Sequence, residues 1–146
     1  MAPNRYFDNA ATSFPKPAAV GEAVLRYLNE VGGPYGRSAY PRALEVSRTV
    51  ETLRDRLATR FGTPQADGLV FMPNATTALN TVLWGLLRTG GHVLISPLEH
   101  NAVMRPLAAL AAHAGVTFDL LPARADGRVD VARLAVALDR KIRLVV

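Results

Sequence analysis

Two short polar stretches carry the side chains that could do chemistry in this sequence. The first is residues 73–80 (PNATTALN), which follow an apolar run and precede a helical pattern. Small and hydroxyl residues at such a turn leave backbone N–H groups free at a helix N-terminus, and these groups and the helix dipole suit a phosphate. Thr76 and Thr77 add hydroxyl donors. The alternative is that Asn74 or Thr76 serves only as the helix N-cap.

The second stretch is residues 96–102 (SPLEHNA), which contains His100. An imidazole just past the end of a strand could stack on a flat heteroaromatic ligand or shuttle a proton. The alternative is a loop or capping histidine. A phosphate cup after one strand and an imidazole after another would hold a planar phosphorylated cofactor at two points. Pyridoxal phosphate has that shape.

The elements that would position these stretches alternate between strands and helices. Apolar runs predict four strands, at residues 69–72, 92–96, 116–121 and 142–146, and Gly and Pro bound the first three. Helical spacing predicts the connecting helices; in the one that runs to about His113, Pro106 either starts the regular part or kinks the helix. Asp126-Gly127 predicts a turn, and Asp130 can cap a short helix after it. This alternation favours an α/β fold with a mainly parallel sheet covered by helices, whose carboxyl edge binds ligands.

The N-terminal part follows a different pattern. Prolines and glycines in residues 1–41 predict an irregular arm with one helix, about Ala18 to Glu30. From Arg42 a helical stripe of apolar residues begins, and Gly62 is expected to end it. We therefore divide the chain into an arm, 1–41, and the first part of a larger domain, 42–146. The last strand has no covering helix after it, so we expect a partial sheet and a truncated domain.

Composition narrows the possible functions. The chain has 146 residues and no cysteine, so a disulfide scaffold and a cysteine-ligated zinc site are excluded. The histidines lack metal-ligand spacing, so we expect no metal. No apolar run reaches the roughly 20 residues of a membrane span, and the N-terminus lacks the apolar core of a secretory signal. We therefore expect no membrane contact and a cytoplasmic protein. The net charge of +5 raises nucleic-acid binding as a hypothesis, but the arginines are scattered among acidic residues. We expect no nucleic-acid partner.

Three separated motifs resemble the class V aminotransferases, with the cysteine desulfurase and selenocysteine lyase group as the closest match. They are residues 6–13 (YFDNAATS), 74–76 (NAT) and 99–106 (EHNAVMRP), and the similarity runs in register from Tyr6 to Val146. The resemblance implies a fold type I enzyme with pyridoxal 5'-phosphate as cofactor, an amino acid such as cysteine as substrate, and normally a homodimer with active sites near the subunit interface.

The resemblance also implies roles for individual residues. Ala75, Thr76 and Thr77 would bind the cofactor phosphate, with Thr76 as the key hydroxyl, and His100 would stack on the pyridine ring as a catalytic residue that moves protons. Asn9, Ala10 and Ala11 would lie near the substrate entrance. Thr77 departs from the pattern, because the family often has a glutamate there.

The resemblance to the cysteine desulfurase group implies release of sulfur from L-cysteine, giving alanine and a persulfide on an enzyme cysteine. The Schiff-base lysine, ring-nitrogen aspartate and catalytic cysteine of that group would all match sequence beyond Val146; neither Lys16 nor Lys141 is at the lysine position. We therefore expect the N-terminal portion of such an enzyme, inactive alone. The alternative is a non-catalytic module that binds a phosphate ligand or pairs with a partner chain. The isolated chain is expected to be marginally stable and aggregation-prone, because the strand at 69–72 would lack its neighbours.

Overall fold

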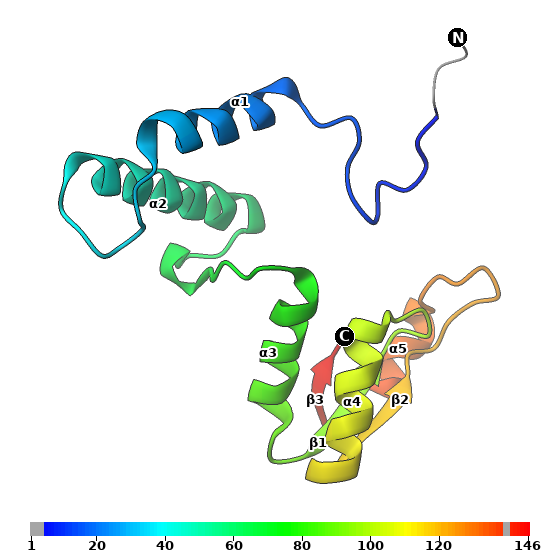
Figure 1. Ribbon diagram of the computed structural model, residues 1–146. Coiled ribbons are helices and arrows are strands. Elements are labelled where there is room, and N and C mark those ends of the chain that lie inside the picture. Colours follow the sequence, from blue (N-terminus) through cyan, green and yellow to red (C-terminus); the bar gives the residue numbers. More distant parts are fainter. Residues whose placement is uncertain (1–4, 139–140) are drawn as a thin grey trace. The chain divides into compact units, whose positions relative to one another are not determined.

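The computed structural model describes residues 5–138 and 141–146. It divides into two compact units, Met1–Val70 and Phe71–Val146 (Figure 1). The predicted division after residue 41 concerns the domains of a longer protein and stays a prediction.

The first unit is helical. Helix α1 (Ala18–Arg26) continues into a π-helical turn (Tyr27–Val31), so the predicted helix is confirmed in extent but its last turn is wider than expected. Helix α2 (Pro41–Phe61) begins with proline at its first position, which suits the fixed φ of that residue. It ends where Gly62 takes a φ of +67°, as the sequence predicted.

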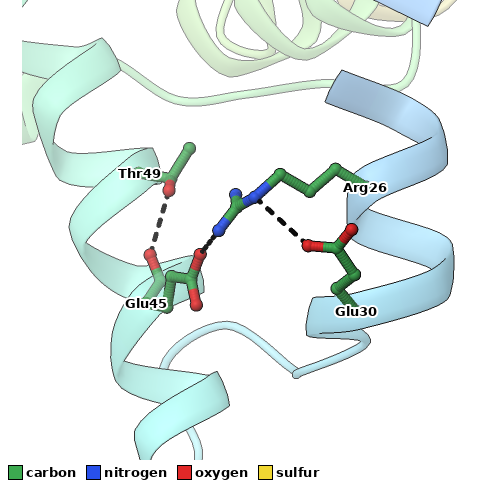
Figure 2. A network of polar contacts seen from close by, with 4 residues as sticks. All are labelled: Arg26, Glu30, Glu45 and Thr49. Carbon is green, nitrogen blue, oxygen red and sulfur yellow. Dashed lines mark hydrogen bonds and ion pairs between the residues drawn. The ribbon is translucent and has the colours of Figure 1, made fainter. Parts of the chain in front are cut away.

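A polar network centred on Arg26 ties α1 to α2 (Figure 2). The Arg26 guanidinium donates a hydrogen bond to a carboxylate oxygen of Glu45, and its Nε lies 3.7 Å from Oε2 of Glu30. Thr49 Oγ1 donates to the backbone carbonyl of Glu45 at 2.9 Å. The hydrogen bond to Glu45 raises the pKa of Arg26 above its ordinary value. Because these side chains are largely solvent-exposed, the network contributes little to the stability of the fold.

The second unit contains a parallel three-stranded sheet in the order β2-β1-β3. Its strands are β1 (Gly91–Ile95), β2 (Val116–Leu120) and β3 (Ile142–Val145), which confirms three of the four predicted strands. The chain is an α/β protein with helices flanking this sheet, as the sequence predicted.

Helices α3 (Ala75–Leu87) and α4 (Asn101–Ala114) pack on one face of the sheet. The core there is apolar and almost fully buried, and it consists of Leu83, Leu87, Val93, Ile95, Val103, Leu107, Leu110 and Val116. The short helix α5 (Val131–Ala137) follows Asp130, whose carbonyl accepts hydrogen bonds from the backbone of Arg133 and Leu134. Strands β2 and β3 lie on opposite sides of β1, so right-handed crossovers put α4 and α5 on opposite faces.

The prediction of a fourth strand at residues 69–72 is wrong for the described structure. These residues follow a 3-10 turn (Ala66–Gly68) and belong to none of the three strands. Val70 is 68% exposed and Phe71 is 46% exposed. An apolar run becomes a strand only when a neighbouring strand lies alongside it, and the described residues supply no such neighbour here.

Pro106 does not start a helix. Helix α4 begins earlier, at Asn101, and continues through the proline to Ala114. Pro106 lies within the helix and is buried. Because proline has no backbone N–H, the carbonyl of Ala102 lacks its usual helical partner.

Candidate functional site

A hollow of about 490 Å³ lies between α3 and α4. Helix α3 contributes Thr76, Asn80 and Trp84, which lie four residues apart on one stripe. Helix α4 and the residue before it contribute His100, Asn101, Ala102, Arg105, Pro106 and Ala109. Because both helices run antiparallel to β1, both begin at the carboxyl edge of the sheet, where parallel sheets bind ligands.

The first turn of α3 has free donors that face outward from the helix end. Asn74 is the N-cap: its Oδ1 accepts hydrogen bonds from the Thr77 backbone N–H at 2.8 Å and from the Thr77 hydroxyl at 3.0 Å. No described residue pairs with the backbone N–H of Ala75, the backbone N–H of Thr76 or the Thr76 hydroxyl. These donors lie at the positive end of the helix dipole, an arrangement that suits an anion, and we call them the cup.

The capping interpretation is therefore correct for Asn74 and not for Thr76. The structure separates the two threonines, since the Thr77 hydroxyl is held by Asn74 whereas Thr76 lines the hollow. Thr77 supports the cup through its cap contact. The unpaired donors of the cup are the backbone N–H groups of Ala75 and Thr76 and the Thr76 hydroxyl.

His100 is the N-cap of α4. Its Nδ1 accepts a hydrogen bond from the backbone N–H of Ala102 at 3.1 Å. In the neutral ring the proton is therefore on Nε2, which the cap leaves available to a ligand. The preceding loop is held by Ser96, whose hydroxyl donates to Glu99 at 2.7 Å. The imidazole lines the same hollow as Thr76, so the structure brings the two predicted contacts together.

Asn9, Ala10 and Ala11 form an exposed turn in the first unit. The Ala11 backbone N–H donates to the carbonyl of Asp8 at 3.1 Å, and Asn9 Oδ1 accepts from the backbone of Phe14 at 3.2 Å. The hollow is built entirely from the second unit. The predicted place of this turn beside the substrate stays a prediction.

Among the lining residues, Asn80, Trp84 and Arg105 carry polar or aromatic side chains to which the sequence interpretation gave no role. Their spacing in the sequence could have revealed them. Asn80 and Trp84 follow Thr76 at intervals of four residues, and Arg105 follows Asn101 by four, so each group lies on one face of its helix. Trp84 is the only tryptophan of the chain and is 42% exposed. The Arg105 side chain has no ion pair or hydrogen bond with any other described residue, so its charge is available to a ligand.

Two other properties concern the described part of the chain as a whole. No group of three or more histidine or acidic side chains lies close enough together there to hold a metal ion. Within residues 5–138 and 141–146, no helix combines the length and apolarity that crossing a bilayer requires.

Comparisons with known proteins show which proteins this chain resembles. The family model of the class V aminotransferases matches residues 5–146. A cysteine desulfurase from Dickeya dadantii (strain 3937) is 31% identical over 98% of this chain and 35% of its own length. The apo structure of a cysteine desulfurase from Thermococcus onnurineus NA1 superposes with a TM-score of 0.81 at 26% identity, covering 96% of this chain and 35% of that one.

A further solved structure, of a C-DES variant with glycine covalently linked to its PLP cofactor, is 25% identical. It superposes with a TM-score of 0.60 over 86% of this chain and 32% of that one. This chain thus spans about a third of the length of the proteins that it matches, and it corresponds to their N-terminal portion.

Proposed function

Because this chain belongs to the class V aminotransferase family, we propose that it is the N-terminal part of a cysteine desulfurase-like enzyme and that its hollow binds pyridoxal 5'-phosphate. The observation that carries the proposal is that Thr76, at a helix N-terminus with free donors, and His100 line one hollow. An anion cup and an imidazole at the carboxyl edge of a parallel sheet suit a flat ligand with a phosphate tail.

The residues present fit this cofactor. The cup of α3 offers two backbone N–H groups and the Thr76 hydroxyl to phosphate oxygens, and the first turn of α3 contains no acidic residue that would repel them. His100 offers a planar ring held by its own cap, with Nε2 available to hold or pass a proton. Ala75, Thr76 and His100 would hold the cofactor, and Thr77 would support the cup.

When bound, pyridoxal phosphate supplies an electron sink for bonds at the α-carbon of an amino acid. In the complete enzyme we propose release of sulfur from L-cysteine, giving alanine and a persulfide on an enzyme cysteine, in a cytoplasmic homodimer. This chain would bind and orient the cofactor, place the His100 ring over it, and admit substrate near Asn9, Ala10 and Ala11. It has no cysteine, so we propose that it is inactive alone.

Trp84 provides a direct binding test, because it is the single tryptophan and lines the hollow. The probe is pyridoxamine 5'-phosphate, which lacks the aldehyde that would react with lysines. We expect saturable quenching of the Trp84 fluorescence, and much weaker quenching by pyridoxamine without the phosphate. Thr76→Val should weaken binding about tenfold, as expected for loss of one hydrogen bond to a charged group.

Thr81→Val is the matched control, because the Thr81 hydroxyl donates within α3 to the Thr77 carbonyl at 2.9 Å and does not line the hollow. Its affinity should equal that of the unmodified chain. Equal binding of pyridoxamine with and without phosphate, or no effect of Thr76→Val, would contradict the proposed site.

The second candidate is a non-catalytic module that binds a phosphate ligand. It is favoured by the fact that every residue that lines the hollow lies within residues 71–146. The coding region after Val146 distinguishes the two. A Ser/Thr-x-His-Lys-like stretch there would support the enzyme, whereas a genuine stop codon followed by an unrelated gene would support the module.

A further inference from the structure

The proline in α4 creates an acceptor at the hollow. In a regular helix the N–H of residue 106 would donate to the carbonyl of Ala102, but Pro106 has no N–H. An unpaired carbonyl in a partly buried place is costly, so another donor is expected to satisfy it.

Asn80 supplies that donor from the neighbouring helix. Its Nδ2 donates to the carbonyl of Ala102 at 3.4 Å and to the carbonyl of Thr76, on its own helix, at 2.9 Å. The amide nitrogen carries two hydrogens, one for each acceptor. Ala102 in turn donates its own N–H to His100 Nδ1 at 3.1 Å. A continuous path of hydrogen bonds therefore joins Thr76, through Asn80 and Ala102, to the imidazole of His100.

We infer that Asn80 is a positioning residue that holds the phosphate cup of α3 at a set distance from the His100 ring. The inference rests on the proposed function, because it assigns Asn80 to the two-point grip on the cofactor. Asn80 acts on the ligand through Thr76 and His100. Pro106 is its counterpart, since the proline is what leaves the Ala102 carbonyl open to Asn80.

A double-mutant cycle tests the Asn80–Ala102 contact without any ligand. Asn80→Leu keeps the size of the side chain and removes both donors, whereas Pro106→Ala returns an N–H to the Ala102 carbonyl. Urea unfolding followed by Trp84 fluorescence gives the midpoint of each variant. We expect Asn80→Leu to lower the midpoint in the native background and to lower it much less in the Pro106→Ala background.

Thr81→Val is the control for this cycle. It removes a hydroxyl that donates to a carbonyl four residues back, as Asn80 does, but reaches no residue of α4. Its effect should be smaller than that of Asn80→Leu and equal in both backgrounds. An equal effect of Asn80→Leu in both backgrounds would overturn the inference. If Asn80→Leu alone fails to fold, restoration of folding by Pro106→Ala supports the contact, and continued failure overturns it.

A comparison of two ligands tests the positioning role itself. Inorganic phosphate occupies only the cup, whereas pyridoxamine phosphate contacts both the cup and the imidazole. Asn80→Leu should lower the affinity for pyridoxamine phosphate about fivefold, the change expected for loss of one hydrogen bond. Inorganic phosphate, measured by competition, should bind unchanged.

Equal weakening of both ligands, or no weakening of either, would show that Asn80 does not set the spacing. Failure of the unmodified chain to bind pyridoxamine phosphate would contradict the proposed function instead. The urea cycle would then still decide whether Asn80 ties α3 to α4.

Discussion

His100 Nδ1 accepts the backbone N–H of Ala102 at 3.1 Å, so one side chain both caps α4 and lines the hollow beside Thr76. A capping histidine and a ligand-binding histidine are usually alternatives. Here the cap uses one ring nitrogen and leaves the other nitrogen and the ring face to a ligand. The two roles can therefore be separated by substitution.

We expect His100→Asn to keep the cap and lose the ring, because asparagine is a good N-cap residue. Pyridoxamine phosphate should bind about tenfold more weakly, as expected for loss of a stacking contact worth about 1–1.5 kcal/mol, while the urea midpoint stays near that of the unmodified chain. His100→Phe should show the opposite pattern, keeping most of the affinity and losing about 1 kcal/mol of stability. Equal affinities for the two variants would contradict a stacking role.

Asn74 should control the cup through the cap of α3. Asn74→Ala removes the acceptor of the Thr77 N–H and hydroxyl, and we expect a loss of about 1 kcal/mol of unfolding free energy. Phosphate affinity should fall as well, because the first turn of α3 would fray. Asn74→Ser, which retains a capping oxygen, is the control in urea unfolding. An unchanged midpoint in Asn74→Ala would show that the cap does not stabilise α3.

Arg105 should add electrostatic attraction for an anionic ligand. It lines the hollow, and long helical side chains lean toward the helix N-terminus, which is the end where the cup lies. Arg105→Gln is expected to lower the affinity for pyridoxamine phosphate about threefold and to make that affinity less dependent on salt concentration. Arg88→Gln, at the far end of α3, should change neither the affinity nor its dependence on salt. If both substitutions had the same effect, the contribution would come from net charge alone.

The turn before α5 offers a pH test. Hydrogen bonds from Arg128 hold the pKa of Asp126 below its ordinary value; Arg128 Nε lies 2.8 Å from Asp126 Oδ2. A carboxyl group with a lowered folded pKa stabilises the turn above its unfolded pKa of about 3.9, and that contribution is lost as the pH falls through the folded value.

Arg128→Gln should therefore raise the pKa of Asp126 toward the ordinary value of an aspartate. An NMR titration of the Asp126 carboxyl group measures this directly. Arg124→Gln is the control, since only its backbone contacts Arg128. A pKa of Asp126 that is equal in the two variants would rule out the side-chain contact as the cause.

The isolated chain should be marginally stable and prone to aggregation. Val82 and Leu86 on α3 are 50% and 45% exposed, and Val70 and Phe71 precede that helix with large exposed fractions. Exposed apolar side chains of this kind favour association between copies. Val82→Gln should raise the solubility of the chain with little change in the urea midpoint. Leu87→Ala, in the core, should instead lower the free energy of unfolding by about 2–5 kcal/mol. Cooperative thermal unfolding of a soluble monomer would contradict this expectation.

Much of the fold follows from local patterns. The end of α2 at Gly62 was predictable because only glycine takes a positive φ easily, and two of the three paired strands, β1 and β2, are apolar runs bounded by glycine and proline. The strand expected at 69–72 shows the limit of such reasoning. Its apolar residues allow a strand, but pairing depends on a neighbour that no local pattern specifies.

The candidate site divides in the same way. Residue types and spacing alone placed Thr76 and His100 after apolar runs and at the start of helices, which is why the sequence suggested a phosphate and a flat ring as ligands. The local cap at Asn74 holds the Thr77 hydroxyl and leaves that of Thr76 free. Tertiary structure decided that Thr76 and His100 line one hollow and that Asn80 reaches Ala102. The physical reason is that caps and helix periodicity act within a few residues, whereas the hollow and its hydrogen bonds exist only once α3 and α4 pack together on the sheet.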